Sequence, residues 1–344
     1  MFVTGWVGLD NRLTNEPITM ESAKIPENPN TSTAIETVDI PAVFSNLTPY
    51  LTASRKQAKA YLDMAGSPES LAGLDVTLRF HFVRFDGDAE PQFRRLAYVL
   101  AQHLVRYCFS ARSRQEHKQN IDDLDEGQLF MMARDMFRKI NTSGEVGELL
   151  LFFILETILG APQVIAKMEL KTNPKDEVKG CDGIHIGWDE AKKEVLFYLG
   201  ESKLYGRVSD ALRDALESIA SLNEAGRRDD EIRLMTSHFK HLDDSLKAEV
   251  FEVANNTAAV GSRFVHACLL GFDWDAYKDM AKDKKVFSAN FATLYKTEIS
   301  RLTAAVHEKL KEYKYRNLRF EFIFLPFSSV DEFRQMFYKS ISGT

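Results

Sequence analysis

The feature that most constrains the fold of this chain is the apolar run LLLFFILETIL at residues 149–159. Gly160 and Pro162 follow it and predict that the helix ends there. A helix that is apolar on nearly every face has to be buried between a sheet and other elements. The run therefore predicts a layered α/β fold.

The pattern of apolar residues predicts the other elements. Period-two alternation predicts a strand at 76–85, and helices are predicted from Pro91 to about Phe109 and from Glu126 to Ile140. A polar loop is expected at 15–37. After residue 141 short apolar strands alternate with helices. We predict strands at 164–170, 180–188, 193–203, 263–272 and 318–327, and helices at 209–223, 229–239, 243–255, 289–313 and 330–340.

The polar stretch NTSGEVGE at 141–148 suggests a domain boundary, because after it helices alternate with short apolar strands. Residues 1–140 are expected to form an N-terminal α+β domain, and residues 141–344 a domain with a mixed sheet flanked by helices. The predicted fold class is α/β.

Composition excludes several classes of protein. The chain has 344 residues, 44 basic and 50 acidic, which gives a net charge of −6 and argues against a general nucleic-acid coat protein. Cys108, Cys181 and Cys268 are odd in number and far apart, so neither a disulfide framework nor a zinc knuckle fits, and a reducing cytoplasm is expected. The longest apolar run, 149–155, is too short for a membrane span.

Two strands joined by a turn at 189–192 bring acidic residues together. Antiparallel pairing about this turn matches residues whose numbers sum to about 383, which sets Asp182 opposite Glu201. Opposed side chains on one sheet face have Cβ atoms roughly 5 Å apart, so two carboxylates repel unless a cation lies between them. Oxygen ligands favour Mg²⁺ or Mn²⁺ over zinc.

Lys203 follows Glu201 by two residues, and the period of a strand places both on one face, with Ser202 pointing away. A metal there would polarise a phosphate and activate water, while the ammonium orients that water or offsets developing charge. The pattern indicates phosphodiester hydrolysis. The alternative is a solvated, mutually neutralising group of charges on an edge strand.

Glu148 is a fourth candidate, since it lies in the first turns of the buried helix and could reach the metal directly or through water. A glutamate near a helix N-terminus is also favoured by the helix dipole alone. Thr142 with Glu145 is predicted to form a capping box, which leaves Glu145 as a cap.

Other polar residues are weighed and set aside. His238 and His241 lack a further ligand at zinc spacing. His185 points to the face opposite Asp182 if the strand is regular, which favours packing. Arg207 and Arg213 could contact phosphates, but charges on an amphipathic helix usually face water.

Asp182, eighteen residues and then Glu201-Ser202-Lys203, after a helix bearing Glu148, resemble the PD-(D/E)xK nuclease superfamily. Cys181 stands where that pattern has proline. The resemblance implies a restriction-endonuclease-like fold at 141–344, with Asp182, Glu201 and Glu148 as metal ligands.

The blocks GELLLFFILETILGAPQVIAKMELKTN, GCDGIHIG and YLGESKLYG, within residues 147–206, are similar to the HamA family of nuclease subunits from the bacterial Hachiman anti-phage system. That resemblance implies a DNA nuclease acting with a helicase partner, HamB, to which residues 1–140 would dock. Two alternatives stay open: a catalytically silent adaptor that gates the helicase, and a nuclease directed at RNA.

Overall fold

The computed structural model describes residues 55–109, 113–114, 117, 126–137, 144–166, 168, 181–192, 194–224 and 262–342. The loop expected at 15–37, the two helices expected at 229–239 and 243–255, and His238 and His241 lie outside these residues. Thr142 lies outside them as well.

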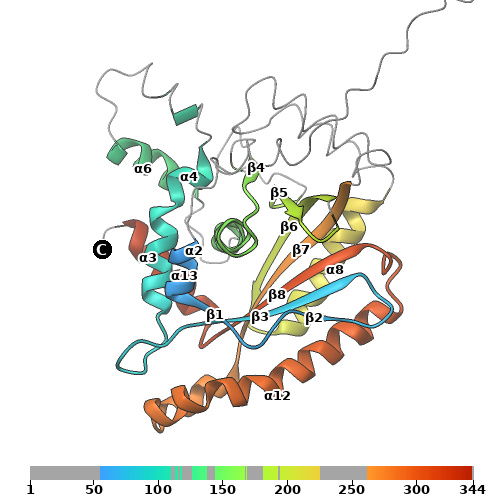
Figure 1. Cartoon of the computed structure of the whole chain (residues 1–344). Coiled ribbons are helices and arrows are strands. Elements are labelled where there is room, and N and C mark those ends of the chain that lie inside the picture. Colours follow the sequence, from blue (N-terminus) through green and yellow to red (C-terminus); the bar gives the residue numbers. More distant parts are fainter. Residues whose placement is uncertain are drawn as a thin grey trace, which may run out of the picture. The chain divides into compact units, whose positions relative to one another are not determined.

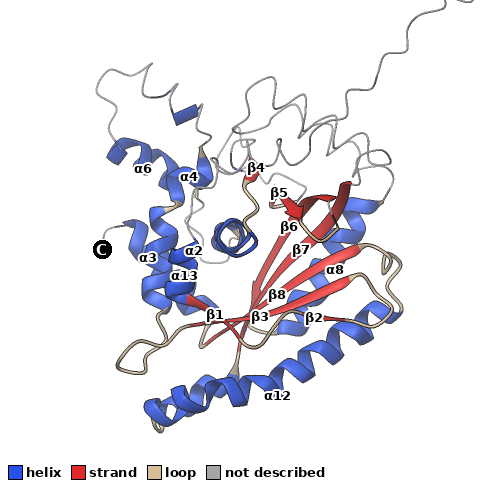
Figure 2. Ribbon diagram, viewed as in Figure 1, coloured by secondary structure: helices blue, strands red, loops and turns tan. Residues whose placement is uncertain are grey.

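One mixed sheet organises the described residues (Figure 2). The strand order is β1-β3-β8-β7-β6-β5-β4, and β2 pairs with β3 off this path. The central strands β3, β8, β7 and β6 run parallel, whereas β5 is antiparallel to β6, and β4 to β5. The strands are β1 (Leu62–Met64), β2 (Glu69–Ser70), β3 (Val76–Val83), β4 (Gln163–Ala166), β5 (Gly183–Asp189), β6 (Glu194–Tyr205), β7 (Ser262–Asp273) and β8 (Arg319–Phe327).

Helices cover both faces of the sheet, so the fold is α/β, as predicted (Figure 1). The longer ones are α3 (Phe93–Gln102), α6 (Glu126–Asp135), α7 (Glu145–Ile154), α8 (Val208–Asn223), α12 (Lys284–Lys311) and α13 (Val330–Ser342). The shorter ones are α2 (Arg55–Tyr61), α4 (Leu104–Cys108), the π-helical turn η2 (Leu155–Leu159) and the 3-10 helix η4 (Asp275–Ala281).

Alternation along the strands assigns each helix to a face. On one face, a Cβ built at Gly200 of β6 would meet Leu151 of α7, and Phe327 of β8 stacks on Phe93 of α3. Helix α13 packs against α3 on this face. On the other face lie α8 and α12, and the hydroxyl of Tyr313, which follows α12, donates to the carbonyl of Leu216 on α8.

The apolar helix lies inside the molecule, as predicted. Every residue of α7 is buried, and in Figure 1 this helix is the green one seen end-on between the sheet and helices α3 and α13. Gly160 adopts a left-handed conformation (φ 67°) that ends the helical segment after η2. The capping role predicted for Glu145 is wrong, because α7 begins at Glu145 itself, with Gly144 as N-cap and no side-chain cap.

Several predicted boundaries shift. The helix predicted at 91–109 is two helices, α3 and α4, separated at His103. The helix predicted to run to 140 ends at Asp135, and the strand predicted at 164–170 occupies Gln163–Ala166. Periodicity identifies apolar faces well but specifies helix ends poorly, because ends depend on individual backbone contacts.

The sheet draws strands from both sides of residue 140. Strand β3 pairs in parallel with β8, from Val76 opposite Phe320 to Phe80 opposite Phe324. Buried residues from both parts also belong to one apolar core. The division of the chain at residue 140 stays a prediction, and its test is given in the Discussion.

Within the described ranges, no helix combines the length and the apolar character that crossing a membrane requires.

Candidate active site

The hairpin of β5 and β6 has the predicted register. Its paired residues run from Gly183 opposite Gly200 to Asp189 opposite Glu194, and every pair sums to 383. At the turn, the Asp189 carboxylate accepts hydrogen bonds from the backbone N–H groups of Ala191 and Lys192, both at 3.1 Å. This Asx turn closes the hairpin at the expected place.

Asp182 lies at a bend just before β5, and its N–H donates to the carbonyl of Gly200 at 2.8 Å, which shifts the pairing by one residue from the register of the hairpin. The hairpin register predicted for Asp182 is therefore not kept at this residue, but Asp182 is close enough for its charge to raise the pKa of Glu201. Its carboxylate Oδ2 accepts two hydrogen bonds from Ser202, from the backbone N–H at 2.7 Å and from the hydroxyl at 2.9 Å. Two donors to one oxygen hold this carboxylate in a single orientation.

Glu201 and Lys203 point to the same face of β6 and form an ion pair with Nζ–Oε1 at 2.6 Å. Strand β6 lies between β5 and β7, not at an edge, and Asp182 and Glu201 are only 9% and 8% exposed. The alternative of a solvated group of charges on an edge strand is therefore wrong.

The pKa of Glu201 is raised to about 7, first by burial and then by the charge of Asp182, against the opposing effects of Lys203 and of a hydrogen bond with Ser218 on α8. Burial alone would lower the pKa of Lys203, but Glu201 and Asp182 outweigh it and the net shift is upward. Two close carboxylates thus share one ammonium, which leaves an excess of negative charge in a desolvated place.

Glu148 lies on α7, on the sheet face opposite the side chains of Glu201 and Lys203, and is 9% exposed. The hydroxyl of the fully buried Tyr107 donates to its Oε2 at 3.1 Å. Both Glu148 and Asp182 raise the pKa of Tyr107, after burial itself. Tyr107 is therefore within electrostatic reach of both carboxylates.

The donor set can be compared with what a divalent cation needs. The described residues contain no group of three or more His, Cys, Asp or Glu side chains positioned to hold a metal ion. Mg²⁺ commonly takes one or two protein carboxylates and completes its shell with water and substrate phosphate oxygens. The pair Asp182 and Glu201, with its excess negative charge, fits that requirement; a direct third ligand from Glu148 has no support in this geometry.

The residues set aside on sequence grounds have structural roles. His185 is buried and its Nδ1 lies 2.9 Å from the carbonyl oxygen of Ala161, as expected for a packed histidine. Arg207 and Arg213 at the start of α8 are exposed and pair with Asp210 of their own helix at 2.7 and 2.9 Å. Such ion pairs between neighbouring turns are typical of the solvent-exposed face of a helix.

Sequence reasoning missed three residues near the site. Ser202 holds Asp182, Tyr107 holds Glu148, and Gly147 lets α7 approach β6, since a Cβ there would come within 3.1 Å of the Ser202 hydroxyl. A serine between two charged strand residues was a visible signal for the first. Tyr107 carried none, because it lies 41 residues from its partner.

The comparisons with known proteins come to two findings. A family model described as HamA matches residues 66–341, which include every candidate site residue. A search of the curated proteins found no match.

Proposed function

This chain belongs to the HamA family, and from that premise we propose that it is a metal-dependent nuclease that hydrolyses phosphodiester bonds of DNA. Membership of the family supports a place in the Hachiman anti-phage defence system. The nuclease activity, the metal and the helicase partner belong to the proposal.

One observation carries the proposal: Asp182 and Glu201 are two buried carboxylates within electrostatic reach of each other, and the ammonium of Lys203 pairs with Glu201 at 2.6 Å. Buried charges of like sign are costly unless they serve a purpose. In the interior of a sheet, the cost of desolvating an ion pair can exceed the attraction between its charges, so such a pair adds little stability by itself. The restriction-endonuclease-like fold proposed for 141–344 is consistent with this hairpin between α7 and α8.

Asp182 and Glu201 would hold Mg²⁺ or Mn²⁺, and a bound ion would polarise the scissile phosphate and lower the pKa of a water molecule. Ser202 fixes the orientation of Asp182 through its two hydrogen bonds. Lys203 orients the attacking water or offsets negative charge on the phosphate in the transition state. Glu148, held by Tyr107, supports the metal through water rather than by direct ligation.

The helicase HamB is the proposed partner, and it would supply DNA handling and activation, in keeping with the net charge of −6. The N-terminal part of the chain is proposed to dock it, in the cytoplasm. One observation favours a second function, a catalytically silent adaptor: no third carboxylate joins the pair among the described residues.

The test is cleavage of plasmid and single-stranded DNA by the purified wild type and by Lys203→Ala. Each is assayed with Mg²⁺ or EDTA, and with and without the helicase partner. Removing the ammonium is expected to lower cleavage by at least about 100-fold, the usual effect of losing one charge-stabilising group. Lys296→Ala, which removes an exposed ammonium from α12, is the matched control and should cut normally.

The outcomes separate the candidate functions. Cleavage that needs both metal and Lys203 supports the nuclease and shows whether the partner gates it. No cleavage of DNA under any condition, with RNA cut instead, moves the substrate to RNA. Intact phage defence in cells carrying Glu201→Ala and Lys203→Ala would assign the adaptor role.

A further inference from the structure

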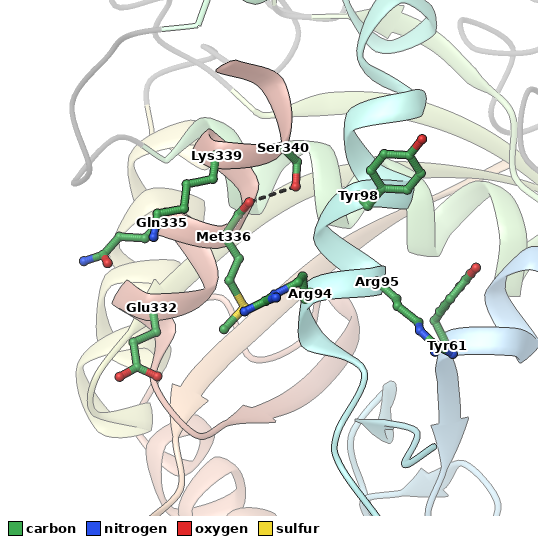
Figure 3. A pocket seen from close by; sticks show the side chains of 9 residues that line it. All are labelled: Tyr61, Arg94, Arg95, Tyr98, Glu332, Gln335, Met336, Lys339 and Ser340. Atoms are coloured by element: carbon green, nitrogen blue, oxygen red, sulfur yellow. Dashed lines mark hydrogen bonds between the residues drawn. The ribbon is translucent and has the colours of Figure 1, made fainter. Parts of the chain in front are cut away.

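A pocket of about 730 Å³ opens between α3 and α13, away from the candidate active site (Figure 3). None of its lining residues belongs to the hairpin of β5 and β6 or to α7. Its size falls within the usual range for a bound small molecule or a nucleotide. The pocket is therefore large enough for a ligand.

The lining of the pocket is basic although the chain as a whole is acidic. Arg94, Arg95 and Lys339 contribute three positive charges, against one negative charge from Glu332. Arg94 and Lys339 make no hydrogen bond or ion pair through their side chains within the part of the chain that the structure describes, and Arg95 donates only to the amide oxygen of Gln92, at 3.3 Å.

Basic side chains on other exposed helices differ in this respect. Arg207 pairs with Asp210, Arg301 with Glu298, and Lys282 with Asp279. The cations of the pocket make no ion pair within the described residues, Arg95 lying only within electrostatic reach of Asp86, and they stay available to an anion. Their position is consistent with a phosphate-binding surface.

The same pocket holds an exposed aromatic ring. Tyr98 of α3 is 58% exposed, whereas the other aromatic side chains of the described residues are buried or half-buried. Tyr61 and Met336 also line the pocket, and in Figure 3 the side chain of Arg94 extends toward Met336. An aromatic ring beside arginines is the arrangement by which proteins bind single strands, since the ring stacks on a base and the cations follow the phosphates.

We propose that the pocket between α3 and α13 holds a short single strand of nucleic acid, with Arg94, Arg95 and Lys339 on its phosphates and Tyr98 stacked on a base. An acidic protein segment would use the cations but has no need of the exposed ring. This site is distinct from the cleavage site. It would let a chain of net negative charge bind nucleic acid through a local group of basic residues. It stands whether or not the chain cuts.

The test measures the fluorescence anisotropy of a short labelled oligodeoxythymidine, with EDTA present and with every protein carrying Lys203→Ala, so that no cleavage can occur. The double variant Arg94→Ala, Arg95→Ala should bind at least about tenfold more weakly. Its salt dependence, as the slope of log K against log salt, should fall by about 1.4. Lys296→Ala, Lys309→Ala on α12 removes the same charge from exposed positions and should bind as the parent does.

Two further variants test stacking. Tyr98→Ala should weaken binding by about fivefold or more, whereas Tyr98→Phe, which keeps the ring, should not. Equal binding by the Arg94, Arg95 variant and its control would overturn the proposal. So would a free nucleotide that binds as tightly as the oligonucleotide, or a polyglutamate peptide that binds through the same arginines while the oligonucleotide does not.

This experiment is separate from the test of cleavage. Loss of oligonucleotide binding in the Arg94, Arg95 variant supports the pocket even if no nuclease activity is found. Cleavage that depends on Lys203, together with unchanged binding by the pocket variants, would support the nuclease and reject the pocket.

Discussion

The carboxylate of Asp182 takes two hydrogen bonds from a single residue, Ser202, through its backbone N–H at 2.7 Å and its hydroxyl at 2.9 Å. Ser202 lies between the ion-paired Glu201 and Lys203, so one strand segment carries three of the groups that define the candidate site. The middle residue of the motif is therefore a positioning residue, because it acts through Asp182.

Ser202→Ala removes the hydroxyl donor and keeps the backbone donor. We expect cleavage to need about 10- to 100-fold more Mg²⁺ for half-maximal rate, as is usual when a group that orients a metal ligand is lost. A Mg²⁺ titration of the cleavage rate measures this. Ser300→Ala, on the exposed side of α12, is the control and should leave the titration unchanged. An unaltered Mg²⁺ requirement in Ser202→Ala would show that the hydroxyl has no part in the site.

Glu148→Gln tests whether α7 contributes to the metal site. We expect a raised Mg²⁺ requirement with a near-normal rate at saturating metal, because the group is proposed to act through water. Tyr107→Phe should give a smaller change in the same direction, since it removes only the hydroxyl that donates to Glu148. Glu145→Gln, which changes a buried glutamate one turn earlier in the helix, serves as the control. If Glu148→Gln and Glu145→Gln behave alike in melting temperature and in the Mg²⁺ titration, Glu148 is structural.

Two buried histidines predict a loss of stability in acid. Burial lowers the pKa of His103 to about 4, with a smaller effect from Arg106, and the pKa of His81 is lowered to about 4 as well, chiefly by burial. Neither ring nitrogen of His103 has a hydrogen-bond partner among the described residues. Because the folded pKa lies below the unfolded value of 6.5, the folded state binds fewer protons. Stability is full above pH 6.5 and falls as the pH drops from 6.5 toward 4.

At about pH 4, each of the two histidines is expected to lower the free energy of unfolding by about 3 kcal/mol. Urea unfolding of the metal-free protein at several pH values measures it. His103→Leu should reduce the acid loss, because no proton can then be taken up at this position on unfolding, while His307→Leu at a half-buried position on α12 should not. Identical pH profiles for His103→Leu and the wild type would contradict the prediction.

A fragment of residues 141–344 tests the predicted domain boundary. Strand β8 would lose its partner β3, and α13 would lose α3, against which it packs. An unpaired parallel strand and an uncovered apolar face predict a fragment that does not unfold cooperatively. Circular dichroism and urea unfolding would show this, with residues 38–344, which form one compact unit, as the control. Cooperative unfolding of the fragment 141–344 would support two domains.

Local sequence patterns predicted several features of this structure. Antiparallel pairing across a short turn allows only one register when the turn is closed by Asp189, so the pairing of Gly183–Asp189 with β6 could be predicted from residue numbers alone. Asp182, one residue beyond that pairing, departs from it through its hydrogen bond to Gly200. The shared face of Glu201 and Lys203 follows from the period of a strand. The burial of α7 follows from its composition, since no face of it is suited to water.

Contacts between distant segments were decided by the tertiary structure. Nothing near Val76 indicates that it pairs with Phe320, because parallel strands are joined through long connections whose length and path leave no local signal. The same is true of Tyr107 and Glu148, and of the pocket between α3 and α13. The sequence by itself determined which side chains share a strand and a face. Only the packing of the sheet with its helices decided which of them are buried together, because burial depends on segments that meet in space and not along the chain.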